Sequence, residues 1–176
     1  MTNTLHDMAT GTFTPLLRVL SGLLDKGAEH AAANKLDVET LLDARLAPDM
    51  FPLIRQVQTA CDHAKGAVAR LTGQTAPRFE DNEKTLPELK ARIAKTIEYL
   101  ETFSAADFET AADRIIRFPL QGVTLEMTGL QLLRDWSLPN FYFHVVTAYD
   151  ILRHNGVNLG KRDFMSHIGY AIRQPA

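Results

Sequence analysis

The segment RLAPDMFPLIRQVQTACDHAKGAVARLTG, residues 45–73, has the periodicity of a long helix with a broad buried face. Its apolar residues recur every three or four positions, as they do on one side of an α-helix. Pro48 and Pro52 fall in the expected first turns, where a backbone N–H would lack a helical partner anyway. Gly73 is a typical residue at a helix end. The pattern predicts a helix over residues 48–71.

Three further segments show the same helical spacing, over residues 4–32, 85–103 and 138–156. Thr85 and Glu88 have the spacing of a capping box, and Ser137 is a candidate cap for the last helix. Pro15 interrupts the first segment, because a proline inside a helix removes one backbone hydrogen bond and crowds the preceding turn. We therefore expect either a kink at Pro15 or a true helix start near Thr14.

The remaining residues predict a hairpin and several short pieces. Residues 114–118 and 123–127 are rich in β-branched and apolar residues, and residues 119–122 separate them, which is typical of a β-hairpin. Short helical turns are expected over residues 38–44 after Asp37, 104–107, 130–136 and 163–167, and a surface loop over residues 74–84. The fold class that follows is an all-α four-helix bundle with a small hairpin inserted between helices three and four, in one domain over residues 1–176.

Composition excludes several classes of partner. The chain has 19 Lys and Arg residues against 21 Asp and Glu, a net charge of −2, whereas a nucleic-acid binder needs a dense basic face. No stretch approaches the roughly 20 apolar residues that span a bilayer, and no secretory signal is recognisable at the N-terminus. Cys61 is the single cysteine, which excludes an internal disulfide and suits a reducing compartment. We expect a cytoplasmic protein that binds neither nucleic acid nor membrane.

Two blocks of the sequence resemble a known family. The stretch FYFHVVTAYDILRHNGVNLGKRDF, residues 141–164, is similar to the last-helix signature of a bacterial domain-of-unknown-function family. Residues 45–73 resemble the second-helix block of the same family, which is grouped with the DinB/YfiT-like four-helix bundles. The resemblance implies a DinB-like bundle and leaves the function of the chain open.

The wider DinB-like superfamily implies a divalent metal held by three histidines, one on the second helix and two four residues apart on the last helix. In this chain His144 stands where the second histidine of that pair would be, but the position four residues earlier is Asn140. The second-helix candidates are Gln56 and His63. Amides are weak ligands for zinc and nickel, so we expect no metal and no other cofactor. The alternative is a zinc or nickel site built from His144, His63 and Asn140.

Each candidate residue has a structural interpretation beside the functional one. His144 could be a hydrogen-bonded core histidine, and His63 a residue at the boundary of the solvated side. Trp136 and the aromatic residues 141–143 could line a small-molecule pocket, or they could belong to the core or to a dimer interface. Tyr149 follows His144 by five residues and is a further pocket candidate. Cys61 has no nearby base in sequence, so we do not expect a catalytic thiol.

Two functions of different classes remain. The first is a non-catalytic, metal-free protein that binds a small ligand or acts as a homodimer. The second is a metal-dependent hydrolase or transferase with an unusual site around His144. Whether the chain is an enzyme stays undecided by its sequence.

Overall fold

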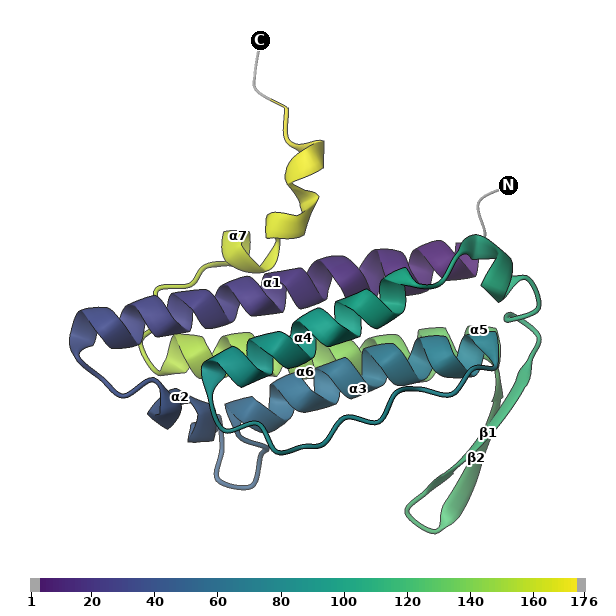
Figure 1. Ribbon diagram of the computed structural model, residues 1–176, viewed down its shortest axis with the longest axis horizontal. Helices are drawn as coiled ribbons and strands as arrows, with labels where there is room; N and C mark the ends of the chain where they lie inside the picture. Colours follow the sequence, from purple (N-terminus) through teal and green to yellow (C-terminus); the bar gives the residue numbers. More distant parts are fainter. Residues whose placement is uncertain (1–3, 174–176) are drawn as a thin grey trace.

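Four long helices form the bundle, as the sequence predicts. The structure is a computed structural model that describes residues 4–173. The helices are α1 (Thr4–Asn34), α3 (Leu53–Thr72), α4 (Leu86–Glu101) and α6 (Leu138–His154). Figure 1 shows them lying side by side, and α3 contacts both α6 and α4 while α1 contacts all three. None of the helices in the described residues has both the length and the apolar character needed to cross a membrane.

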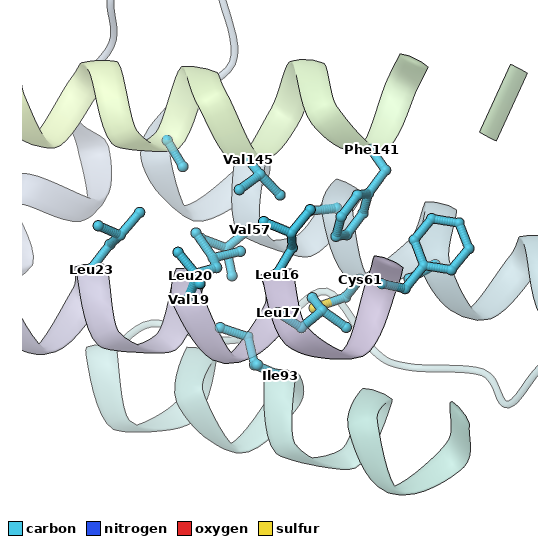
Figure 2. Packing of buried hydrophobic residues seen from close by; sticks show 14 of the residues in the cluster. Leu16, Leu17, Val19, Leu20, Leu23, Val57, Cys61, Ile93, Phe141 and Val145 are labelled. Carbon is cyan, nitrogen blue, oxygen red and sulfur yellow. The ribbon is translucent and has the colours of Figure 1, made fainter. Parts of the chain in front are cut away.

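The core fills the space between α1, α3, α4 and α6. Leu16 and Leu20 of α1, Val57 of α3 and Val145 of α6 meet there, with no more than 2% of any of them exposed (Figure 2). The rings of Phe13 and Phe141 pack edge to face, with their centroids 4.9 Å apart. Burying a side chain of this size stabilises a fold by about 1.5–3 kcal/mol. This packing fixes which faces of α3 and α6 point towards each other.

The first helix runs through its proline. α1 begins at Thr4 and is continuous to Asn34 with Pro15 inside it, so the expectation of a start near Thr14 is wrong. The backbone clash of a proline falls on the carbonyl four residues earlier, which here belongs to Gly11. Burial of Phe13 and Leu17 on both sides of the proline holds this turn in the core. Tertiary packing therefore outweighs the local cost.

The second long helix starts later than expected. α3 begins at Leu53 rather than near residue 48, because Pro52 has an extended backbone with ψ of 165°. The short helix α2 (Glu39–Asp43) precedes it, and its N-cap residue is Val38, one position later than predicted, while Asp37 Oδ1 accepts the N–H of Glu39. Gly73 ends α3 with a left-handed backbone at φ of 74°, as predicted.

The third helix begins with the predicted capping box. Thr85 Oγ1 accepts the N–H of Glu88, and the Glu88 carboxylate accepts the N–H of Thr85. A second capping box, between Ser104 and Asp107, starts the short 3₁₀ helix η1 (Ala105–Phe108). Both starts could be predicted from sequence because the pairing is local.

The hairpin consists of β1 (Ile115–Leu120) and β2 (Val123–Thr128), which pair antiparallel. The turn between them has only two residues, Gln121 and Gly122, both with positive φ. The loop is therefore shorter than the predicted four residues, because Pro119 and Leu120 belong to β1. Figure 1 shows the hairpin leaving the bundle near α5.

The last long helix has an unexpected beginning. The short helix α5 (Gly129–Gln131) continues through a π-helical segment, η2 (Leu132–Ser137), directly into α6. Ser137 has helical backbone angles and no side-chain capping bond, so its predicted role as a cap is wrong. Pro139 explains the wide turn, because it lacks an N–H and its ring would clash with a carbonyl in an ordinary α-helical turn.

The chain then turns back along α1. After Gly156, at φ of 90°, a helix α7 (Lys161–Phe164) and a 3₁₀ helix η3 (Ser166–Ala171) follow. Both contact α1, and Figure 1 shows the end of this segment projecting from the bundle. The sequence predicted one helical turn here.

Candidate functional site

His144 and Gln56 form the centre of the site. His144 is 7% exposed on α6, and its Nδ1 lies 2.7 Å from Oε1 of the buried Gln56 on α3. The Gln56 side chain also donates from Nε2 to the carbonyl oxygen of Phe51, at 3.0 Å. Because a carbonyl can only accept, the Gln56 amide has to turn its oxygen towards His144. His144 therefore donates from Nδ1 and keeps its lone pair on Nε2.

A second imidazole stands beside the first. The ring of His63 stacks on that of His144, with the centroids 5.6 Å apart and the planes 18° from parallel. Gln56 and His63 are seven residues apart, which is two helical turns, so both face α6. The exposed Phe143 ring lies nearly perpendicular to that of His144, with the centroids 5.3 Å apart. The structure thus brings together three residues that the sequence singled out, His144, His63 and Gln56.

The surroundings keep both imidazoles uncharged. Burial, together with smaller contributions from the neighbouring His63 and Arg55, lowers the pKa of His144 to about 4. Burial also lowers the pKa of His63, and Arg70 adds to this effect while Asp62 opposes it. At neutral pH the pair therefore offers neutral ring nitrogens as hydrogen-bond donors and acceptors.

An aromatic wall continues the site towards the hairpin. The Trp136 ring centroid is 6.4 Å from that of His63 and 5.7 Å from that of Phe118 on β1. The guanidinium of Arg70 lies over the Phe118 ring, 4.7 Å from its centroid. Sequence reasoning missed Phe118 and Arg70. Arg70 could have been found, because it follows His63 by seven residues on the same helix face, whereas no local pattern joins Phe118 to α3.

Two predicted site residues behave differently. The Asn140 amide donates back to the carbonyl oxygen of Trp136 in η2, at 2.7 Å, rather than turning to a side chain of α3. Tyr149 packs its ring against Phe164 of α7, with centroids 6.3 Å apart, and so contacts the tail instead of the imidazole pair. Cys61 is fully buried, and burial raises the pKa of its thiol to about 11.

The donor set does not fit the three-histidine metal site that the superfamily implies. His144 Nε2 is a good ligand atom and His63 is adjacent, but a catalytic zinc site of this type needs a third protein ligand. Asn140 already donates its amide to a backbone carbonyl. Within residues 4–173 there is no group of three or more His, Cys, Asp or Glu side chains that could hold an ion.

The bundle and its inserted hairpin define the class of protein. A crystal structure of a DinB family member from Shewanella denitrificans superposes with a TM-score of 0.90 at 47% sequence identity, covering 97% of this chain and 96% of that one. The chain is thus a DinB-like four-helix bundle, as its sequence indicates. Residues 5–165 match the family described as a domain of unknown function (DUF1993), and the chain belongs to this family. Curated proteins include no significant match.

Proposed function

We propose that this protein binds a small ligand without a metal, in the site between α3 and α6. The stacked pair of His63 and His144 carries the proposal, because two uncharged imidazoles sit at the edge of the core and Gln56 fixes the tautomer of His144. Ordinary core packing does not require a second histidine there. A site of this kind orients its ligand through hydrogen bonds rather than through charge.

The chemistry of the site favours a flat ligand with a hydrogen-bond donor. His144 Nε2 is an acceptor in the tautomer that Gln56 imposes. Trp136 and Phe118 provide aromatic surface beside the imidazoles, and aromatic groups prefer offset or edge-to-face packing at such distances. A planar heteroaromatic molecule with an N–H or O–H matches both features.

The binding experiment uses NMR on protein labelled with ¹⁵N at histidine. A set of planar heteroaromatic fragments is added to the full chain, and the ring nitrogens of His63 and His144 are observed. Binding shifts these resonances saturably, and His144→Phe abolishes the response while His154→Phe, on the exposed side of the same helix, preserves it. Fragments that shift no histidine ring signal, or that bind His144→Phe as well as wild type, contradict the proposal.

The alternative function is a metal-dependent hydrolase or transferase at the same place. One observation favours it: a histidine whose Nδ1 donates to an amide oxygen presents Nε2 as metal-binding histidines do. Elemental analysis of protein purified without a histidine tag separates the two functions. Stoichiometric zinc or nickel that disappears in His144→Ala overturns the metal-free proposal, and its absence after soaking with both metals removes the alternative.

We also propose that the chain forms a homodimer through the outer side of α6. Tyr142, Phe143 and Val146 are each at least 39% exposed there, and aromatic residues are favoured at protein interfaces. Phe143 also contacts His144, so such an interface would border the ligand site. The cytoplasm is the compartment we propose, because it suits a chain whose one cysteine is a free thiol.

A further inference from the structure

A cavity of about 510 Å³ lies between α1 and the C-terminal segment formed by α7 and η3. Figure 1 shows α7 beside α1 and the end of the segment projecting away, and both α7 and η3 contact that helix. The cavity shares no lining residue with the site between α3 and α6. Its volume falls within the roughly 300–1,000 Å³ of small-molecule sites.

The lining of the cavity is basic. Arg18 and Lys26 contribute from α1, and Arg162 contributes from α7. Arg18 pairs with Glu101, and Lys26 pairs with Asp163 at 2.7 Å, so each of these cations already has a carboxylate. The guanidinium of Arg162 has no ion pair or side-chain hydrogen bond to any residue from 4 to 173. The cavity therefore holds one cation whose charge is not neutralised.

One wall of the cavity is apolar, and no side chain fills the space next to it. Val19 and Leu23 are at most 6% exposed and form part of the lining. Gly22 lies between them on α1, and a Cβ atom added there would meet no heavy atom within 4 Å. A glycine inside a helix is about 1 kcal/mol less favourable than alanine. The open space thus persists at a position where a larger residue would stabilise the helix.

A polar atom at the cavity also lacks a partner. His167 of η3 lines the cavity, and its Nδ1 is buried without a hydrogen bond to any described residue. Buried polar groups in folded proteins are satisfied in the great majority of cases, by protein, water or ligand. A carboxylate bound in the cavity would bring acceptor oxygens that a protonated Nδ1 needs.

We propose that this cavity binds a small carboxylate with a hydrocarbon or aromatic body. The carboxylate pairs with the Arg162 guanidinium, whose planar fork matches two carboxylate oxygens. The body of the ligand lies on Val19 and Leu23 in the space that Gly22 leaves open. This site is separate from the one between α3 and α6, so either can fail without the other.

The test is a fluorescence titration of the full chain with 8-anilinonaphthalene-1-sulfonate, an organic anion with an aromatic body, followed by competition with octanoate. We expect saturable binding that octanoate displaces. Gly22→Leu fills the cavity and Arg162→Gln removes the unpaired cation, so each raises the dissociation constant at least tenfold. Gly11→Leu lies on the same helix, where an added Cβ also meets nothing within 4 Å, and should bind as wild type does.

Three results overturn the proposal. They are the absence of saturable binding, failure of octanoate to compete, and an unchanged dissociation constant in Arg162→Gln. Arg162 is exposed on a four-residue helix, so its variant tests binding even if Gly22→Leu does not fold. Val123→Glu, at an exposed residue of the hairpin outside the cavity lining, is a control that should leave the titration unchanged.

Discussion

His144 makes the stability of the fold depend on pH. Its pKa is about 4 in the folded chain against an ordinary value near 6.5, so the unfolded chain binds more protons between these values. The free energy of unfolding therefore has its full contribution from this group above about pH 6.5, and loses it as pH falls towards 4. Between pH 7.5 and pH 5 the loss is about 2 kcal/mol.

Urea unfolding at these two pH values measures the effect. His144→Gln should show a smaller difference between pH 7.5 and pH 5 than wild type, since the titrating group is gone. His154→Gln is the matched control, because His154 is an exposed histidine on the same helix, and it should keep the wild-type difference. Equal pH dependence in wild type and His144→Gln would show that His144 is not held neutral.

Arg92 is a second residue on which stability depends. Although it is charged, only 2% of it is exposed, and it pairs with Asp62, Asp81 and Glu83 at 2.8–3.0 Å. Removing one partner of a buried ion pair typically costs about 3 kcal/mol or more. Asp62 and Asp81 keep Lys65 and Arg55 as partners, but the Glu83 carboxylate, only 10% exposed, loses its cation. We expect Arg92→Leu to lower the free energy of unfolding by about this amount.

Chemical denaturation checks this expectation against Lys95→Leu. Lys95 is exposed on α4, less than one turn from Arg92, and surface substitutions usually change stability by less than about 0.5 kcal/mol. In Arg92→Leu the 74–84 loop should also become susceptible to limited proteolysis, because Asp81 and Glu83 hold it to α4 through Arg92. Wild-type stability with an intact loop would show that the cluster is dispensable.

Two glycines in the helices differ in how much space surrounds them. A Cβ atom at Gly129, in α5, would lie 1.9 Å from the backbone oxygen of Ala111, so any side chain forces the backbone apart. A Cβ atom at Gly11, in α1, meets nothing within 4 Å. We expect Gly129→Ala to destabilise the fold by about 2 kcal/mol or more, and Gly11→Ala to stabilise it by about 0.5–1 kcal/mol. Thermal unfolding of the two variants should shift in opposite directions.

Elements with local causes could be predicted from sequence. The capping box at Thr85, the glycine stop at Gly73 and the two strands of the hairpin all rest on neighbouring residues, and all are present. The π-helical segment before α6 and the uninterrupted passage of α1 through Pro15 were not predicted. The passage of α1 through Pro15 depends on the burial of Phe13 and Leu17, which no local pattern records, whereas the wide turn before α6 has a local cause in Pro139 that was overlooked.

The same division applies to the site. The periodicity of two helices was enough to bring Gln56, His63 and His144 together as candidates. It could not reveal that Asn140 donates back to the carbonyl oxygen of Trp136, because that choice depends on the wide turn there. Arg92 stands between Leu89 and Ile93 at a core position of α4, and a charged residue at such a position indicates a buried ion cluster. It was missed because the 74–84 loop was interpreted as surface only.

At the scale of the whole molecule, ligand binding and self-association should depend on each other. The exposed face of α6 lies next to the imidazole pair. Phe143 belongs to this exposed face, and its ring contacts that of His144. A partner that covers Phe143 would also restrict solvent at His144. His144 is already buried in the single chain, with its pKa lowered to about 4, so a partner that covers it further would strengthen the same effect of burial.

Light scattering of wild type should therefore give twice the 19.6 kDa mass of the chain, and Phe143→Glu should give a mass near 19.6 kDa. A glutamate at the centre of the apolar face would place an unpaired charge in the interface, which is strongly unfavourable. Val123→Glu makes the same change at an exposed apolar residue of the hairpin, and should leave the dimer intact. A wild-type mass near 19.6 kDa at working concentration, or equal masses for the two variants, would contradict dimerisation through α6.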